Sequence, residues 1–249
     1  MATTTERLHI VITGATSGIG MQLAKDYLAK DQHVYAVGRD DEALAELKSL
    51  GATSIDLDLM DREAVIAAFE KLDTIDLAIC CAGTCEYLDM PNFDSESFMK
   101  VMSINMGTLS HAIEGVLPKL IASKGRLVGL GSASAYVPFA RAEAYGSSKA
   151  AIHYLMKTLQ ISLAPFDVAV SLVVPGFVDT PMTEQNDFPM PFLVSAEDAA
   201  GRIVKGLRQG RNEIAFPRRF TWTLKALGAL PQGLIDRMAA SMSRKSRNE

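Results

Sequence analysis

The sequence predicts an α/β protein: a Rossmann-like, doubly wound, mainly parallel seven-stranded sheet with helices on both faces, in a single domain. Short β-branched runs alternate with longer amphipathic stretches along the 249 residues. The runs are apolar on both faces, which is typical of a parallel sheet covered by helices on both sides. No linker, repeat or low-complexity segment divides the chain, so we expect one domain.

The strands and helices are expected in regular alternation. The strand segments are residues 8–13, 33–38, 53–58, 75–81, 125–131, 167–174 and 212–216. The helical segments are residues 18–30, 41–50, 61–72, 95–121, 144–164 and 195–209. Two helix starts carry capping signals: Asp61 precedes REAV, and Ser195 begins SAED, which has the Ser-x-x-Asp form of a capping box.

Composition and charge exclude several classes of protein. Apolar residues make up 48% of the chain, which is enough for a large core and too much for a disordered protein. The net charge of −4 gives no electrostatic reason to expect nucleic-acid binding. The charge is uneven, because residues 211–249 hold eight Lys or Arg against three Asp or Glu.

The three cysteines, Cys80, Cys81 and Cys85, lie in one short stretch. An odd number with two adjacent residues is a poor disulfide framework and favours a reducing compartment. No histidine lies nearby in the sequence, so we expect buried or loop thiols and no metal. The N-terminal residues lack the features of a signal peptide, and the apolar run at 9–14 is too short to span a bilayer. We therefore expect a cytoplasmic protein.

A glycine-rich turn, TGATSGIG at residues 13–20, joins the first strand to the first helix. Gly14 permits a tight turn, and Gly18 and Gly20 allow a pyrophosphate and the helix to approach the backbone closely. The phosphates would lie at the amides of the helix N-terminus, where the helix dipole favours negative charge. Because the turn follows a strand and opens a helix, it predicts a dinucleotide site rather than a merely structural turn.

The chain resembles the short-chain dehydrogenase/reductase family, in its single-domain branch, from about Leu8 to Thr180. The glycine turn is followed, in the family's order, by CCAG (80–83), SINMG (103–107), GSASAY (131–136), AYGSSKAA (144–151) and PGFVDT (175–180). CCAG stands where the family usually has Asn-Asn-Ala-Gly, so we expect a modest effect on stability and no change of reaction. The resemblance implies that residues 1–217 form an NAD(P)-binding and catalytic domain that interconverts carbonyls and alcohols.

The resemblance also implies roles for single residues. Tyr145 is the general acid/base, Lys149 assists it and contacts the nicotinamide ribose, Asn105 holds a water, and a serine polarises the carbonyl. Ser132 is favoured over Ser134 for that serine, because it lies thirteen residues before Tyr145. The cofactor-binding residues implied are Gly14, Thr16, Ser17, Gly18, Ile19, Gly20, Arg39, Asp58, Leu59, Ala82, Gly83, Tyr145, Lys149, Pro175, Gly176, Val178 and Thr180.

The spacing of Tyr145 and Lys149 has a chemical reason. Residues four apart are neighbours on one face of a helix. A free tyrosine has a pKa of about 10, which is too high for a base at neutral pH. We expect the lysine ammonium to stabilise the phenolate and so to lower the pKa of Tyr145.

The end of the second strand predicts the cofactor. An enzyme that prefers NAD usually has an acidic residue there for the ribose 2′-hydroxyl, but this chain has Gly38 followed by Arg39. A guanidinium can bind a 2′-phosphate, so NADP(H) is favoured over NAD(H). Ser17 stands where the family has a second basic residue, and Asp40 and Asp41 remain able to reach a ribose.

The substrate site is expected under a lid at residues 181–194, which is rich in apolar side chains. Such a lid suits a hydrophobic carbonyl or alcohol; the alternative is that these side chains only pack against the domain. The expected substrate-binding residues are Ser132, Phe139, Tyr145, Phe177 and Met182.

Residues 218–249 form a basic, amphipathic, helical extension, either part of the same domain or peripheral to it. It is open whether it forms a flap beside the pocket, a dimer contact or a contact with an anionic membrane surface; membrane contact is not favoured. The helices at 95–121 and 144–164 are the family's usual pairing surface, so a homodimer or homotetramer is expected.

Two classes of function remain. The leading hypothesis is an NADP(H)-dependent reductase or dehydrogenase for a small-molecule carbonyl or alcohol, with a 3-oxoacyl-thioester reductase as an alternative within the family. The second class is a non-catalytic NADP-binding regulatory protein. Such a protein would not need Ser132, Tyr145 and Lys149 together, so the sequence favours the enzyme.

Overall fold

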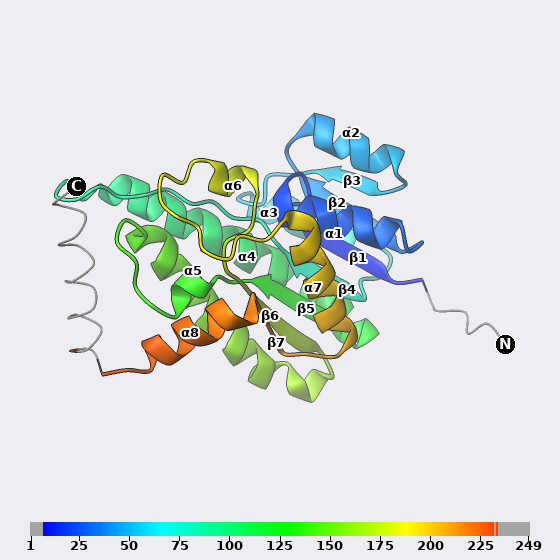
Figure 1. Ribbon diagram of the computed structural model, residues 1–249. Helices are drawn as coiled ribbons and strands as arrows, with labels where there is room; N and C mark the ends of the chain where they lie inside the picture. The colour runs from blue at the N-terminus through cyan, green and yellow to red at the C-terminus, as the bar shows by residue number, and fades with distance from the viewer. Residues whose placement is uncertain (1–6, 232, 234–249) are drawn as a thin grey trace.

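A seven-stranded sheet forms the centre of the protein (Figure 1), which the computed structural model describes for residues 7–231 and 233. The strands are β1 (His9–Thr13), β2 (His33–Gly38), β3 (Thr53–Asp56), β4 (Leu77–Cys80), β5 (Arg126–Leu130), β6 (Ala169–Pro175) and β7 (Glu213–Phe216). Their order in the sheet is β3-β2-β1-β4-β5-β6-β7, and every neighbouring pair is parallel. The predicted doubly wound α/β fold is confirmed.

Helices cover both faces of the sheet. They are α1 (Gly18–Leu28), α2 (Asp41–Ser49), α3 (Arg62–Glu70), α4 (Ser95–Ser123), α5 (Glu143–Ser162), α6 (Pro181–Glu184), α7 (Ala196–Arg208) and α8 (Arg218–Gly228). Short 3₁₀ turns lie at η1 (Ala133–Ala135) and η2 (Ala164–Phe166). One apolar core joins the sheet to α3, α4 and α5, and a second joins it to α1 and α7. Burial on both faces explains why the inner strands are mainly apolar, whereas the edge strand β3 is partly exposed and mainly polar.

Helix caps fix where several helices begin. Asp61 accepts a hydrogen bond from the amide of Ala64 at 3.0 Å, and Ser195 accepts one from the amide of Asp198 at 3.2 Å. Both satisfy amides that have no partner inside the helix. The starts of α3 and α7 are therefore those that the capping signals predict.

Some boundaries differ from the sequence prediction. The third strand ends at Asp56 rather than at residue 58, because the Asp58 carboxylate accepts from the amide of Met60 at 2.9 Å and turns the chain towards α3. The lid contains the single turn α6, which is not among the expected helical segments; its N-cap Thr180 and Thr183 form a reciprocal capping box.

The described part of the C-terminal extension is mainly α8. Its Leu224 is buried in the core that also includes α4 and α5, and Thr221 is buried with it. This segment therefore packs on the sheet domain. The rest of the predicted extension, at 232 and 234–249, lies outside the described residues, and so does the membrane contact considered for it. Among the residues that the structure describes, no helix is long and apolar enough to cross a membrane.

Candidate active site

The glycine turn lies at the carboxyl end of β1, against the end of β4. Gly14 has φ of +65°, and a β-carbon there would lie 2.7 Å from the backbone nitrogen of Ala82. Only glycine fits both the left-handed conformation and this close contact. Ser17, the N-cap of α1, makes no side-chain capping bond. The first amides of α1 therefore remain available to an anion.

Three neighbouring cavities run along the carboxyl edge of the sheet. The first, of about 840 Å³, lies between the ends of β1, β2 and β3; the second, of about 150 Å³, lies over the glycine turn. The third, of about 350 Å³, lies under the lid. The second and third share Tyr145, Gly176, Met182 and Thr183 in their walls. A long ligand can therefore reach from the ends of the first strands to the lid, which is where open α/β sheets bind ligands.

The residues implied as cofactor-binding line these cavities. The first cavity is lined by Gly14, Thr16, Ser17, Arg39, Asp58, Leu59, Ala82 and Gly83, among others. The second is lined by Gly14, Ser17, Gly18, Ile19, Gly20, Ala82, Gly83, Tyr145, Lys149, Pro175, Gly176, Val178 and Thr180, among others. The structure brings the whole set together, although it spans most of the chain.

The end of β2 carries the charges that bear on cofactor choice. Arg39 Nη1 lies 3.9 Å from the Asp58 carboxylate, with most of the Arg39 side chain in solvent. The Asp40 carboxylate accepts from the amide of Ala43 at 2.9 Å and so caps α2. Asp40 is therefore engaged by its own helix, whereas the Arg39 side chain is mostly exposed beside the first cavity and can meet a ligand there.

Tyr145, Lys149 and Ser132 meet where the second and third cavities join. Lys149 Nζ lies 5.5 Å from the centre of the Tyr145 ring and donates to the carbonyl oxygen of Leu130 at 3.0 Å. Ser132, at the end of β5, is buried, and its Oγ accepts from Ser134 Oγ at 3.0 Å. The four-residue spacing on α5 thus brings the phenol and the ammonium together, as the sequence predicts.

Burial controls the ionisation of this pair. Desolvation raises the pKa of Tyr145, and the hydroxyl of Ser132 acts in the opposite direction. Desolvation also lowers the pKa of Lys149, to about 8. The expected fall in the pKa of Tyr145 is therefore wrong for the protein groups alone, because desolvation by burial is the largest influence on it and raises it. Tyr145 is a neutral phenol at neutral pH.

Asn105 lies beneath these cavities in the middle of α4 and is fully buried. Its amide nitrogen donates to the Thr84 carbonyl at 3.0 Å and to Ser148 Oγ at 2.8 Å, and its oxygen accepts from the Thr84 amide at 2.7 Å. Asn105 thus ties the loop after β4 to α5, next to Lys149. It does not line any of the three cavities described above.

His153 is a neighbour of the site that sequence reasoning missed. It lies on α5 one further turn beyond Lys149, is buried, and its Nε2 accepts from the amide of Ser132 at 3.3 Å. Gly131 makes room for it, because a β-carbon there would lie 2.5 Å from Nε2. Desolvation lowers the pKa of His153 to about 4. The sequence did carry a signal for His153, because it follows Tyr145 and Lys149 at four-residue spacing and so lies on the same face of the helix.

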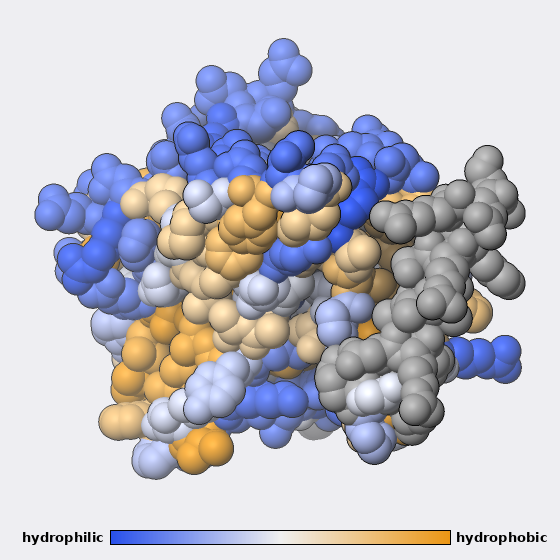
Figure 2. Space-filling view, turned by 90° about the vertical axis from the view of Figure 1, so that its left-hand side faces the viewer, coloured by the Kyte–Doolittle hydropathy of each residue, from blue (hydrophilic) through white to orange (hydrophobic). Residues whose placement is uncertain are grey.

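The third cavity is lined mainly by apolar and aromatic groups. The residues expected to bind substrate, Ser132, Phe139, Tyr145, Phe177 and Met182, all line it. Its walls also include Cys85, Tyr87, Arg141, Asn186, Phe188, Phe220 and Leu224, among others. Neither Cys85 nor Tyr87 was expected to line the substrate site. The sequence signal that could have indicated this is that both residues follow the carboxyl end of β4, where open α/β sheets bind ligands. Figure 2 shows this side of the molecule, where apolar residues gather at the centre and lower left.

The three cysteines are free thiols in this structure. Burial raises the pKa of Cys80 and of Cys81 to about 12, so both remain protonated at neutral pH. The Thr13 hydroxyl acts in the opposite direction on the pKa of Cys80, and Thr13 is paired with Cys80 across β1 and β4. Over residues 7–231 and 233, no group of three or more His, Cys, Asp or Glu side chains is arranged to hold a metal ion.

Fold and site together define a dinucleotide-binding α/β enzyme with a tyrosine, a lysine and a serine beside an apolar cavity. The sequence matches the short chain dehydrogenase family over residues 8–189. It is 30% identical to an uncharacterized oxidoreductase of Myxococcus xanthus over 240 residues, which cover 92% of this chain and 95% of that protein. It is 29% identical to the 11-beta-hydroxysteroid dehydrogenase-like 3 protein of Arabidopsis thaliana, covering 91% of this chain and 78% of that protein.

Solved structures are similar as well. A short chain dehydrogenase of Burkholderia cenocepacia in complex with NADP superposes with a TM-score of 0.84 and 25% identity, covering 93% of this chain and 97% of that chain. A short-chain dehydrogenase of Sphingobium yanoikuyae in complex with NADPH gives a TM-score of 0.80 at 23% identity, covering 92% and 95%. The protein belongs to the short-chain dehydrogenase/reductase family and is an oxidoreductase.

Proposed function

We propose that this protein is an NADP(H)-dependent oxidoreductase that interconverts a hydrophobic ketone or aldehyde and the corresponding alcohol, with Tyr145 as the general acid/base. The observation that carries the proposal is the position of Tyr145. Its side chain lies in the wall shared by the cavity over the glycine turn and the apolar cavity under the lid. A dinucleotide laid along the sheet edge would meet a substrate there.

The residues around this point can move the proton that the reaction needs. The nicotinamide, when bound, supplies or accepts the hydride at the carbonyl carbon. In reduction, the Tyr145 hydroxyl donates its proton to the carbonyl oxygen, and the Ser132 hydroxyl donates a hydrogen bond to the same oxygen. The Lys149 ammonium, near the Tyr145 ring, stabilises the tyrosinate that remains. The raised pKa of Tyr145 keeps the phenol protonated for this step.

The activity is tested by following the absorbance of NADPH, with NADH in parallel, in the presence of ketones and aldehydes. The panel includes aliphatic chains, aromatic ketones, steroids and 3-oxoacyl thioesters. We expect NADPH consumption with hydrophobic carbonyls, because the cavity walls are mostly apolar. A protein that binds NADPH but turns over none of these carbonyls would instead support the regulatory alternative.

The preference for NADP(H) rests on Arg39. It lies beside the first cavity with Gly38 in place of an acid, and the Asp40 carboxylate is occupied in capping α2. The Burkholderia and Sphingobium relatives contain NADP and NADPH, which supports the same cofactor here. A guanidinium recognises a phosphate through charge-assisted hydrogen bonds.

Changing Arg39 to aspartate is expected to lower the ratio of kcat/KM for NADPH to that for NADH by about 10- to 100-fold. This is the effect of losing a charge-assisted hydrogen bond of about 1.5–3 kcal/mol. The Arg211→Asp variant is the control, because Arg211 lies just before β7 and does not line the first cavity. An unchanged ratio in Arg39→Asp would contradict this assignment of the phosphate site.

The assembly and location are proposed on separate grounds. On α5, Tyr154 and Ile161 lie seven residues apart on one face and are 78% and 77% exposed, although both side chains are large and mainly apolar. Such a face is typical of a subunit contact. We therefore propose a twofold homodimer through α4 and α5, which can extend to a tetramer. The free thiols fit a reducing compartment, and we propose a cytoplasmic location.

A further inference from the structure

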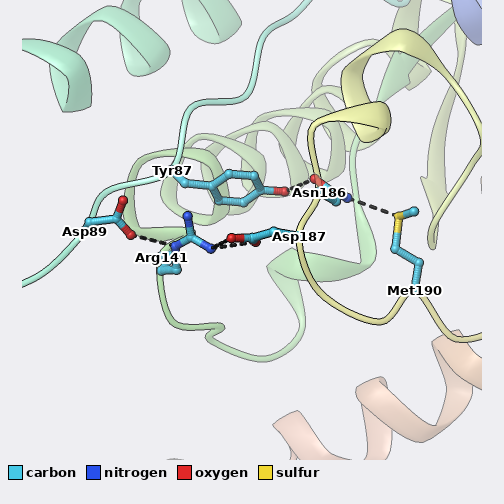
Figure 3. Close-up of polar contacts among 6 residues, drawn as sticks. All are labelled: Tyr87, Asp89, Arg141, Asn186, Asp187 and Met190. Atoms are coloured by element: carbon cyan, nitrogen blue, oxygen red, sulfur yellow. Dashed lines mark hydrogen bonds and ion pairs between the residues drawn. The ribbon is translucent and has the colours of Figure 1, made fainter. Parts of the chain in front are cut away.

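A polar network joins three loops at the outer wall of the apolar cavity (Figure 3). Arg141 comes from the loop before α5. Tyr87 and Asp89 come from the loop between β4 and α4. Asn186 and Asp187 come from the lid, residues 181–194. Segments about one hundred residues apart in the sequence are thus connected by their side chains.

Arg141 is the centre of this network. Its Nε donates to the Asp89 carboxylate at 2.7 Å, and its Nη1 donates to the Asp187 carboxylate at 2.7 Å. Its guanidinium carbon lies 5.2 Å from the centre of the Tyr87 ring, and its carbonyl oxygen accepts from the amide of Leu88 at 3.1 Å. The planar fork of arginine suits such simultaneous contacts, which a lysine cannot reproduce.

The backbone of Arg141 is unusual. Its φ of +68° lies in the left-handed region, which is uncommon for residues with a β-carbon. Such a conformation persists where surrounding contacts determine it, and it is frequent at ligand clamps. We infer that the side-chain contacts of Arg141 hold the loop in a backbone conformation that the loop would otherwise rarely adopt.

The lid also contacts the loop between β4 and α4, and its own residues contact one another. The Tyr87 hydroxyl donates to the Asn186 side-chain oxygen, and the Asn186 nitrogen donates to Met190 Sδ at 3.2 Å. The Gln185 side chain donates to the carbonyl oxygen of Cys85 at 3.4 Å. Tyr87 also packs edge-on against Phe188 of the lid, with ring centres 5.7 Å apart. These contacts align the lid so that Asp187 faces Arg141.

The network is also a wall of the cavity, because Tyr87, Arg141 and Asn186 line it. We propose that Arg141, by pairing with Asp89 and Asp187, clamps the lid against the loop after β4 and thereby determines the size of the substrate that the cavity accepts. Arg141 is a positioning and specificity-determining residue, since it acts through the lid and not on the reacting carbonyl. The statement about substrates rests on the proposed carbonyl reductase function; the statement about the lid does not.

The clamp is suited to open during turnover. Asp89 and Asp187 have 75% and 66% of their side-chain surface exposed, against 37% for Arg141. Ion pairs at this exposure are individually weak and are screened by salt. Two such pairs and one ring contact bias the lid towards the closed position without locking it. Substrate entry and product release therefore need no large local unfolding.

The test compares hydrogen exchange of lid amides in the wild-type chain, Arg141→Gln and Asp187→Asn, each with and without NADPH. The control is Arg202→Gln, which removes an exposed ion pair with Asp198 on α7, the helix that follows the lid. We expect exchange in residues 183–194 to rise about two- to tenfold in both clamp variants. We also expect about 1 M salt to produce a similar rise in the wild-type chain, because the Debye length falls to about 3 Å.

The second readout is a series of ketones of increasing size. In both clamp variants, we expect KM for small ketones to rise and kcat/KM for bulky ketones to improve relative to the wild-type chain, with kcat for small ketones little changed. The clamp proposal would be overturned if both clamp variants showed the same hydrogen exchange of the lid amides and the same preference for ketone size as the control Arg202→Gln. If exchange rises but no ketone is reduced by the wild-type chain, the proposed function fails while the lid clamp stands.

Discussion

Changing Tyr145 to phenylalanine is expected to lower kcat for carbonyl reduction by about 10²- to 10⁴-fold, the range that a positioned general acid contributes. The change deletes one hydroxyl and keeps the ring, which is packed beside Lys149 and the wall of both cavities. Affinity for NADPH is expected to stay within a few-fold, because the glycine turn and the end of β2 are untouched. Steady-state NADPH oxidation gives kcat, and fluorescence titration gives cofactor affinity.

The matched control for this change is Tyr154→Phe. Tyr154 lies on the same helix as Tyr145, but 78% of it is exposed, so loss of its hydroxyl should leave kcat unaltered. The two variants differ in whether the deleted hydroxyl borders the substrate cavity and not in the chemistry of the substitution. If Tyr145→Phe kept kcat within twofold of wild type while binding NADPH, the proton donor would have to be another group.

The architecture was predictable because it depends on local and periodic signals. Parallel strands buried on both faces produce apolar runs, and the helices between them produce amphipathic periods, so strand number and class follow from the sequence. Asp61 and Ser195 marked helix starts that the structure shows as caps. The glycine turn was predictable for a similar reason, since few residues other than glycine tolerate the conformation of Gly14.

The sets of residues implied by the family resemblance also meet in space, although their catalytic and binding roles stay predictions. Order along the chain was sufficient to name them, because every strand of a parallel sheet ends at the same edge. The order of the motifs along the chain does not show how deeply each side chain is buried. The pKa of Tyr145 was expected to fall with Lys149 nearby, whereas desolvation by the surrounding groups raises it.

Contacts between distant segments were the least predictable part of the site. Nothing in the sequence pairs Arg141 with Asp89 or Asp187, although the structure places both carboxylates on its guanidinium. The loops that carry these residues have no period, so their mutual positions follow from tertiary packing alone. The position of His153 was unpredictable for the same reason, because the ring fits beside Ser132 only where Gly131 lacks a side chain.

His153 leads to a prediction about acid stability. Its Nε2 accepts the amide proton of Ser132, so the ring must be neutral in the folded protein. Desolvation is the main cause of the low pKa of about 4, and Lys157, Lys149 and Lys225 add to it while Glu213 opposes it. In the unfolded chain, the ring titrates at about 6.5. Between these two values only the unfolded state gains the proton, so stability falls as the pH decreases from about 6.5 towards 4.

The loss attributable to His153 amounts to about 3 kcal/mol of unfolding free energy by pH 4, since one pKa unit corresponds to 1.36 kcal/mol. Above pH 7 both states are neutral and the effect vanishes. Urea unfolding at several pH values, compared between the wild-type chain and His153→Gln, isolates this loss because the other titrating groups are common to both. Glutamine retains a side-chain oxygen that can accept from the Ser132 amide, so this variant should keep the hydrogen bond at pH 7 and lose less stability on acidification.

A second variant separates the charge of His153 from its hydrogen bond. His153→Leu also removes the titration, but it leaves the buried Ser132 amide without its acceptor, at a cost of about 1–3 kcal/mol at every pH. The two variants should therefore show parallel pH profiles, offset from each other and both shallower than that of the wild-type chain. An equally steep profile in all three proteins would mean that the acid sensitivity arises from the carboxylates and that His153 accepts its proton in the folded state as readily as in the unfolded one.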